Sequence, residues 1–499
     1  MLAVSAMLHG CSLAVPYPDP EIEVCDDHED DDLDRAIDCD DPDCNGAVAC
    51  LPQIPWLAAG TPTLARPAIP CGPGWRSITL ADGSAACDPF PDAGASPCGP
   101  GAAHFPGAAG CEPIGRACPV GEWPADLPST GVYYVRPGAT GNGTRDSPAG
   151  EIVVPGPSAA PVVIALARGV HLVPQLTLTV PTTIRGVCAS DTTLRFSSSE
   201  SNLAIFAPST AGGPLAIEDV RIEVSGVGVG VRAENALTLR GVELVGARST
   251  GVLALGTGDG ARFEAEGLVV SGVDPDPSGL LGFGISLGAD VQARLHRVIV
   301  EHVHAAGITG GSVALADVVV RDVQEVVGTG ASAYGVGSTG LVTMSDVLVE
   351  GVAGTGVIAQ GPTTMRDVLV RDVRASADDL AGSGVTVLLS GRLDARGLSI
   401  TDVDRHGLVV VGPATARVED LIVRDVRGPG PFSAGVFVGN TTLELARARV
   451  ESATIGVLAL IGGFVRVTDL SVEATWLGGV VAGRGSEIDL ARGIVDAGA

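Results

Sequence analysis

The residues best suited to chemistry lie in an acidic run near the N-terminus. Asp30, Asp32, Asp34 and Asp38 occupy positions 1, 3, 5 and 9 of a short loop. Carboxylates at this spacing converge on one hard cation, and Ca²⁺ is the cation that such loops hold. Arg35 stands where a glycine usually makes the sharp turn. We therefore predict a calcium site here, with a solvated acidic spacer as the alternative.

A second group of titratable residues lies at one edge of three consecutive repeats. It consists of Asp378, Asp379, Asp402, Asp404 and Asp425, together with His406, Arg374, Arg405 and Arg427. Carboxylates beside arginines can hold calcium and an acidic sugar, and such groups can also move a proton. Asp402 and Asp425 fall at turn positions, where Asp is common for structural reasons. The group is thus a candidate calcium-binding or catalytic cluster, with solvated loop charges as the alternative.

The elements that position these residues are repeated strands, found from Leu215 to the C-terminus. Each repeat contains an apolar strand, a corner, a second apolar strand and then Gly-Val. Self-similarity of this kind, with period-two alternation, is typical of a stacked β-solenoid. The first corners are Asp219, Gly241, Gly267, Arg297, Asp317, Asp346, Asp367, Gly397, Asp420, Arg447, Asp469 and Arg492. The second corners are Gly246, Gly272, His302, Asp322, Gly351, Asp372, Asp402 and Asp425. Gly and Asp suit both columns because they tolerate left-handed backbone.

The strand after each first corner predicts three columns of side chains. Val318, Val347 and Val368 stack inside the coil. An outward column alternates in charge: Glu301, Arg321, Glu350, Arg371, Thr401, Arg424 and Glu451. Beside it runs an outward apolar stripe: Val269, Ile299, Val319, Leu348, Leu369 and, after Ser399, Ile422. A long apolar stripe on a surface must be covered, either by the chain's own loops or N-terminal module or by a partner.

Long connections recur on every second coil and enter at the same place. They span 274–283, 324–334, 374–383 and 427–434. Loops on alternate coils leave room for one another, because the rise between coils is too small for successive bulky excursions. The sequence therefore predicts one loop-decorated edge, and repetition along it suits a long polymer bound by several weak contacts.

The start of the repeats resembles a known fold. Tyr133–Thr144, Val162–Leu166 and Gly169–Leu172 resemble the entry into the right-handed parallel β-helix of the pectin-lyase-like superfamily, and the later repeats resemble its coils. This resemblance implies an all-β protein related to enzymes that cleave acidic polysaccharides. The hydrolase patterns Asn-x-Asp and Gly-His-Gly are absent from the sequence. We therefore expect a non-catalytic scaffold for carbohydrate or a cell-surface protein, with a calcium-dependent polysaccharide lyase or hydrolase as the alternative.

Two further resemblances concern export. Cys25–Cys44 resembles an Asp-rich metal-binding repeat of secreted bacterial proteins, and Met1–Cys11 resembles the end of a bacterial lipoprotein signal. The second resemblance implies lipidation of Cys11. The other ten cysteines form an even set, which predicts disulfides and an extracytoplasmic location. Their pairing stays open, although Cys71 with Cys87 and Cys98 with Cys111 are convenient neighbours.

Charge and composition limit the partners. A formal net charge of -27 disfavours nucleic acid, which requires clustered cations. No segment reaches the length of a membrane span, so we expect contact with a membrane only through a lipid anchor at the outer membrane or cell surface, or simple secretion. We divide the chain into a signal end at 1–11, an acidic module at 12–55, a Cys/Pro/Gly-rich stalk at 56–130 and a β-helix at 131–499.

Overall fold

The computed structural model describes most of the chain from residue 71 onward. The described residues are 71, 75–79, 85–90, 94–154, 162–197, 202–211, 213–226, 228–256, 261–276, 278–279, 281–326, 332–376, 382–428 and 433–496. The chain divides into two units, Met1–Thr63 and Leu64–Ala499, and every described residue belongs to the second. Among these residues, no helix has the length and apolar character needed to cross a membrane.

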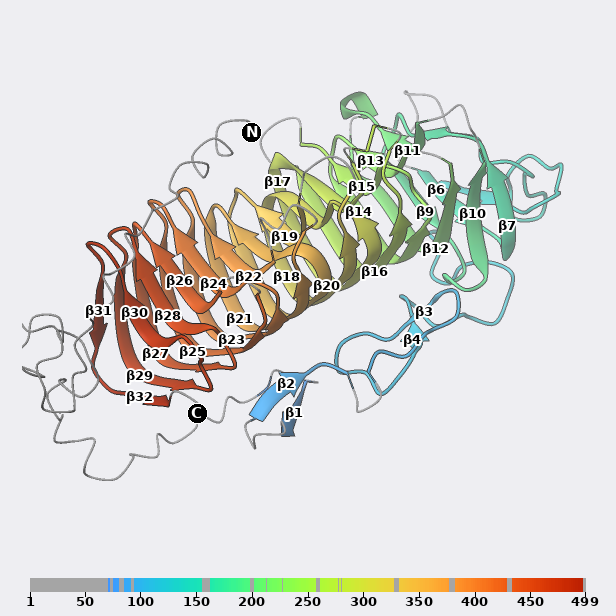
Figure 1. The fold of residues 1–499 in the computed structure, drawn as a ribbon. Helices are drawn as coiled ribbons and strands as arrows, with labels where there is room; N and C mark the ends of the chain where they lie inside the picture. The colour runs from blue at the N-terminus through green and yellow to red at the C-terminus, as the bar shows by residue number, and fades with distance from the viewer. Residues whose placement is uncertain are drawn as a thin grey trace, which may run out of the picture. The chain divides into compact units, whose positions relative to one another are not determined.

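The second unit is a right-handed parallel β-helix whose coils stack along one axis (Figure 1). Each coil contributes to three parallel sheets, numbered here 1 to 3. Sheet 1 contains β5 (Val132–Val135), β6 (Val162–Leu166), β9 (Thr182–Arg185), β31 (Glu487–Leu490) and the first part of nine long strands. These are β12 (Leu215–Ser225), β14 (Leu237–Val245), β16 (Arg262–Val273), β20 (Val342–Ala359), β21 (Pro362–Arg374), β23 (Arg392–Val403), β25 (Thr415–Val426), β27 (Thr442–Glu451) and β29 (Phe464–Glu473).

Sheets 2 and 3 complete each coil. Sheet 2 contains β7 (Gly169–Val173), β10 (Thr192–Ser197), β32 (Gly493–Asp496) and the next part of the long strands. Sheet 3 contains β8 (Leu176–Thr177), β11 (Leu203–Ala207), β13 (Val229–Ala233), β15 (Thr250–Ala254), β19 (Ala333–Ser338), β22 (Ser383–Val387), β24 (His406–Val411), β26 (Ala434–Gly439), β28 (Ile455–Leu460), β30 (Gly478–Ala482) and the end of β20. The strands β17 (Phe283–His304) and β18 (Ala306–Gln324) pass through sheets 3, 1 and 2 in turn. A 3₁₀ turn covers Ser209–Ala211.

Both predicted corner columns have left-handed backbone. The non-glycine residues of the first column, between sheets 1 and 2, have φ between 52° and 63° from Asp219 to Asp469. Arg492, at the last predicted corner, does not have positive φ. The second column, between sheets 2 and 3, behaves in the same way at His302 and at Asp322. One residue in this conformation turns the chain from one sheet to the next, which explains the recurrence of Gly and Asp.

The interior follows the predicted register. Val318, Val347 and Val368 are direct partners on adjacent strands, and all three are buried. The repeated Gly-Val pair has a steric cause, because the glycine in sheet 3 faces an aliphatic side chain of sheet 2. At Gly307 an added Cβ would lie 2.3 Å from Cγ1 of Val320. This contact distance leaves no room for any side chain but hydrogen.

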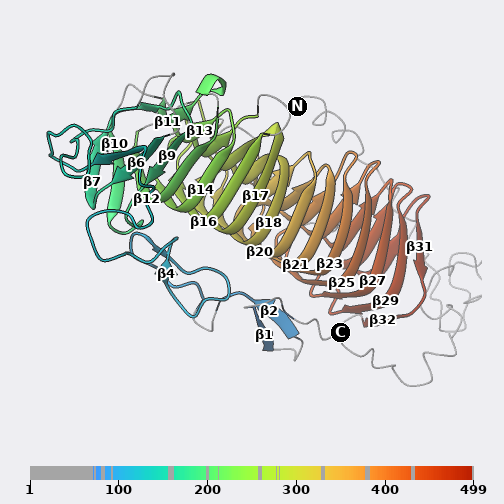
Figure 2. The same ribbon diagram turned by 180° about the vertical axis from the view of Figure 1, so that it is seen from behind.

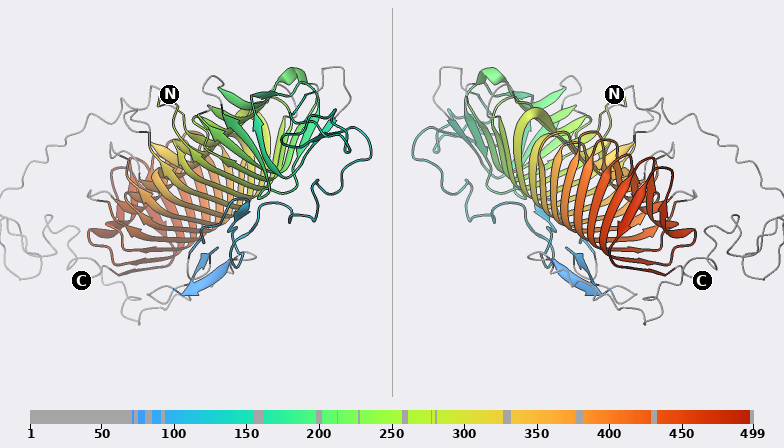
Figure 3. Two further views of the ribbon diagram at one scale, coloured as in Figure 1. Left: turned by 90° about the vertical axis from the view of Figure 1, so that its right-hand side faces the viewer. Right: turned by 90° about the vertical axis from the view of Figure 1, so that its left-hand side faces the viewer.

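A short N-terminal segment packs against the outer face of sheet 2; we call residues 94–118 the strap. Figures 2 and 3 show the two-stranded pairs of this region, β1 (Arg76–Thr79) with β2 (Ala85–Asp88) and β3 (Ala102–Ala103) with β4 (Glu112–Pro113), beside the coils. Three disulfides hold the segment: Cys71–Cys87, Cys98–Cys111 and Cys118–Cys188. The first two are the neighbour pairings considered from sequence, and the third ties the strap to the β-helix.

The apolar stripe on sheet 2 is covered by this segment. One buried cluster joins Val269, Ile299, Val319, Leu348 and Leu369 to Trp75, Phe90, Ala103, Phe105 and Ile114. The alternative in which the chain itself covers the stripe is therefore confirmed from Val269 to Leu369, and the covering residues belong to the predicted stalk. Polar contacts fix its position: Gly101 N donates to Glu243 at 2.7 Å, Arg297 pairs with Glu112 at 2.6 Å, and Arg371 pairs with Asp88 at 3.2 Å. Gly115 packs against Gly241, where an added Cβ would lie 2.4 Å from the opposing Cα.

Candidate functional site

Several predicted site residues lie outside the described residues. They are the calcium-loop residues Asp30, Asp32, Asp34 and Asp38, the lipidation residue Cys11, and Asp378 and Asp379 of the second acidic group. Within the described part of the chain, Cys118, Cys188 and Asp191 are the one set close enough to share a metal ion. Its two cysteines are joined in a disulfide, so this set is structural.

The fold brings the middle of the second acidic group together at the predicted loop edge. Arg374 donates to both carboxylate oxygens of Asp402, at 3.0 and 3.1 Å, and its Nη1 lies 3.5 Å from Asp404. Arg427 Nη2 lies 2.9 Å from the same Asp402. Asp404 also accepts a hydrogen bond from the backbone N of Ala375 at 2.9 Å. The hydrogen bonds that Arg374 donates to Asp402 raise the pKa of its guanidinium, which therefore stays charged. Both carboxylates thus already have cationic partners.

His406, on the same edge, is neutral at ordinary pH. Burial, and then the charge of Arg405, lower the pKa of His406 to about 4. Its Nδ1 accepts a hydrogen bond from Ala434 N at 3.2 Å, so the ring proton is on Nε2. The ring lies 5.3 Å from that of Phe437, measured between centroids. Asp425 is exposed at the neighbouring corner. A base with so low a pKa, already accepting a hydrogen bond, is poorly matched to proton abstraction near pH 7.

The four long connections leave the coils at the predicted edge, between sheets 2 and 3. They follow β16, β18, β21 and β25, which end at Val273, Gln324, Arg374 and Val426. The ion-pair network of Arg374, Asp402, Asp404 and Arg427 therefore forms the base of the last two connections. We call this set the loop-base network.

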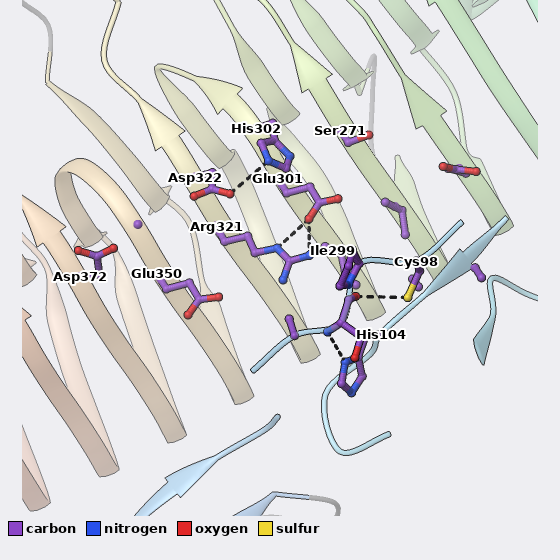
Figure 4. A pocket seen from close by; sticks show the side chains of 18 residues that line it. Cys98, His104, Ser271, Ile299, Glu301, His302, Arg321, Asp322, Glu350 and Asp372 are labelled. Carbon is purple, nitrogen blue, oxygen red and sulfur yellow. Dashed lines mark hydrogen bonds and ion pairs between the residues drawn. The ribbon is translucent and has the colours of Figure 1, made fainter. Parts of the chain in front are cut away.

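A second site, which sequence reasoning missed, is a cavity of about 490 Å³ between the strap and sheet 2 (Figure 4). The outward charge column forms its floor. Arg321 Nε donates to Glu301 Oε2 at 2.7 Å, and Arg371 Nε donates to Glu350 Oε2 at 2.7 Å, as the alternating charges predict. Figure 4 shows Asp322 beside His302, with 3.4 Å between Oδ2 and Nε2. The sequence signal for its floor was the alternating outward charge column of Glu301, Arg321 and Glu350.

Acidic corners also stack on one another. Asp317, Asp346 and Asp367 occupy the first corner of successive coils. Burial, and then the carboxylates of Asp317 and Asp367, raise the pKa of Asp346 from 3.8 to about 6, while Arg366 opposes the rise. Among the described residues, no hydrogen-bond donor reaches its buried Oδ1. This stack is therefore a place where the fold tolerates electrostatic repulsion.

Comparisons with known proteins give remote backbone likenesses. No protein-family model matches the chain, and no curated protein does. The solved structures similar to it include gene product 12 of bacteriophage phi29 (TM-score 0.41, 13% identity, covering 67% of this chain and 53% of that one). The α-1,3-glucanase of Streptomyces thermodiastaticus has a TM-score of 0.42 and 14% identity, covering 68% of this chain and 63% of the other. The periplasmic alginate epimerase AlgG has a TM-score of 0.40 and 10% identity, covering 63% and 78%.

The strand pairing decides the fold. Coil after coil, three parallel sheets continue through the described residues without an intervening α-helix. The chain is a right-handed parallel β-helix. A parallel β-helix can carry many functions on one scaffold, so the activity of this one must be argued from its own side chains.

Proposed function

We propose that this protein is an exported, surface-anchored and non-catalytic β-helix scaffold that binds a linear carbohydrate through its loop edge. The observation that supports the proposal is the recurrence of long connections on alternate coils, between sheets 2 and 3. Similar sites in a row bind a repetitive polymer with an avidity above the affinity of any one of them. The loop-base network supports binding rather than turnover, because Arg374 already occupies Asp402 and Asp404.

The outer face of sheet 3 lies beside this edge and adds contacts of the kind that sugars use. Tyr334 and Thr309 join their hydroxyls at 2.8 Å on adjacent strands. His406 and Phe437 pack their partly buried rings together on neighbouring coils. Rings with polar tips bury apolar area while keeping a hydrogen-bonding group, as the alternating faces of a pyranose require.

Anchoring belongs to the proposal as well. Lipidation of Cys11 would place the β-helix at the outer membrane or cell surface, and calcium bound by Asp30, Asp32, Asp34 and Asp38 would order the acidic module. Growing cells with a fatty-acid analogue should label the protein but not its Cys11→Ser variant. Equal labelling of both forms would remove the lipid anchor from the proposal.

Affinity electrophoresis tests the binding function. Purified protein should be retarded in gels that contain at least one polymer from a panel of neutral and uronic polysaccharides. Arg427→Ala, which removes an exposed cation of the loop-base network, should weaken the retardation severalfold. Arg417→Ala is the matched control, because Arg417 is equally exposed but lies on sheet 1 and pairs with Glu419 of its own strand.

The same samples test the alternative function. With calcium present, polygalacturonate and alginate should give no unsaturated product and no new reducing ends. Turnover that disappears in Asp404→Ala would establish a calcium-dependent lyase or hydrolase instead. Protein that no polymer retards, and that releases no product, would contradict both functions.

A further inference from the structure

The cavity under the strap has a floor, a roof and an open side. Its floor consists of Glu301, Arg321 and Glu350 on sheet 2, whose side chains are 18%, 21% and 20% exposed. At one side, the corner residues His302 and Asp322 are 62% and 50% exposed. The polar floor is therefore reached from the side of the second corners, below residues 95–104 of the strap (Figure 4).

The ion pairs of the floor leave three polar groups without a protein partner. Both contacts of Arg321 fall on Oε2 of Glu301, through Nε at 2.7 Å and Nη2 at 2.5 Å. The single contact of Glu350, with Arg371, also falls on Oε2. Within the described part of the chain, Glu301 Oε1, Arg321 Nη1 and Glu350 Oε1 are therefore available. They offer acceptor, donor and acceptor on successive strands, about 4.8 Å apart.

One part of the remaining lining is apolar, beside polar residues such as Ser96, His104 and Ser271. Val269 and Ile299 line the cavity beside the floor, and Pro97, Ala102 and Ala103 approach it from the strap. Gly351, between Asp322 and Asp372 in the corner column, leaves a notch in the rim because it has no side chain. A cavity of about 490 Å³ in which several polar groups converge beside a small apolar patch has the size of a small-molecule site.

The charge of the cavity selects among ligands. Glu243, Glu301, Asp322, Glu350 and Asp372 line it, whereas Arg321 is its one arginine. Nearby arginines neutralise most of these acids: Arg221 pairs with Glu243 at 2.6 Å and Arg371 with Glu350 at 2.7 Å. An anionic ligand would be repelled by the excess of carboxylates in the lining. The acceptor–donor–acceptor row of the floor instead matches hydroxyl groups, because each hydroxyl both donates and accepts a hydrogen bond.

We propose that this cavity binds a short neutral saccharide of one or two units. Hydroxyls of the sugar donate to Glu301 Oε1 and Glu350 Oε1 and accept from Arg321 Nη1. The site is separate from the loop edge, lies on a different sheet and excludes uronic sugars. It would give the scaffold a second specificity that does not depend on polymer length.

Saturation-transfer NMR and calorimetry on the full chain test this site with five probes. Maltose, cellobiose and diacetylchitobiose are neutral, digalacturonate is anionic, and spermidine is cationic. At least one neutral disaccharide should bind with a Kd in the millimolar range or tighter, and digalacturonate should not compete with it. Glu350→Gln, which replaces one carboxylate by an amide, should weaken binding about tenfold.

A space-filling pair of variants locates the site. Ser271 lines the cavity, so Ser271→Phe should abolish saccharide binding by occupying it. Thr401 belongs to the same outward column but does not line the cavity, so Thr401→Phe should bind as the unchanged protein does. Far-ultraviolet circular dichroism checks that both variants keep the β-helix.

Three results would overturn the proposal. The first is that no neutral disaccharide binds at about 10 mM. The second is binding that Ser271→Phe leaves intact, because the ligand would then sit elsewhere. The third is binding of digalacturonate or spermidine in place of the neutral sugars. Retardation by polymers depends on the loop edge and should survive in Ser271→Phe, so the two functions can fail independently.

Discussion

Replacing Asp346 by Asn should stabilise the protein at neutral pH. Asp346 stands between Asp317 and Asp367 in the first corner column, and burial and these two carboxylates raise its pKa to about 6. The difference from 3.8 corresponds to about 3 kcal/mol if nothing screens it. Because the side chain is partly exposed, we expect about 1 kcal/mol. Asn tolerates the left-handed backbone of this corner, and its amide can donate to a neighbouring carboxylate.

The pH dependence follows from the direction of the shift. Below about pH 4 the carboxyl group of Asp346 is protonated in both the folded and the unfolded chain, so its pKa shift costs nothing. As pH rises from about 4 to about 6, the unfolded chain loses this proton first and stability is lost. The penalty is complete above about pH 6. Asp346→Asn should therefore raise the unfolding midpoint by about 1–2 °C at pH 7.5 and leave it unchanged at pH 3.5.

Differential scanning calorimetry at several pH values measures this effect, and Asp420 supplies the control. Arg447 Nε and Nη2 lie 2.6 and 3.1 Å from the two carboxylate oxygens of Asp420 in the same column. Asp420→Asn should thus destabilise the protein, by about 1–2 kcal/mol at pH 7.5. If Asp346→Asn lowers the midpoint at pH 7.5, or raises it equally at pH 3.5, the repulsion inferred for this stack is wrong.

Three further predictions concern packing and metal binding. Gly307→Ala should lower the free energy of unfolding, measured in urea, by about 1–3 kcal/mol, because the added Cβ would overlap a valine methyl group. Gly439→Ala is the control and should be nearly neutral, because its added Cβ would lie 3.5 Å from the nearest atom. A similar loss of stability in both variants would refute the steric cause. Phe105→Ala removes a buried side chain of the cluster that covers the apolar stripe, so it should loosen the strap. We expect more binding of a hydrophobic dye and faster proteolysis near residue 100. Unchanged dye binding would mean that the stripe stays covered. Calorimetry on the oxidised full chain should show calcium binding that Asp32→Ala removes, and no heat at millimolar calcium would leave the acidic run as a spacer.

Most of the β-helix could be predicted from local patterns. The alignment of Val318, Val347 and Val368 followed from period-two alternation, because a shift of one residue would turn every valine outward. The left-handed corners followed from the residue types that tolerate them. The charge column was legible because parallel strands in register bring Glu301 and Arg321 side by side. These features depend on neighbouring coils, whose spacing the repeat itself defines.

The strap and its cavity were beyond such reasoning. Residues 94–118 have no periodicity, and their contacts connect residues that are far apart in sequence, such as Gly101 with Glu243. The apolar stripe showed that a cover was needed, but not which segment supplies it. The loop-base network was found at the predicted edge. Its internal pairing, in which Arg374 takes both Asp402 and Asp404, depends on side-chain directions that spacing does not define.

The strap also changes how the β-helix should come apart. In a plain solenoid each coil holds only its neighbours, so coils can unravel one at a time from either end. Here Cys118–Cys188 and Glu112–Arg297 connect the strap to the coils, and Asp88–Arg371 connects the segment just before it to a later coil. The coils between these three contacts must therefore unfold together. Among the described residues, the coils that follow Leu369 of the covered stripe are not joined by such contacts. Amide hydrogen exchange should therefore show one cooperative block under the strap and progressive fraying toward the C-terminal coils.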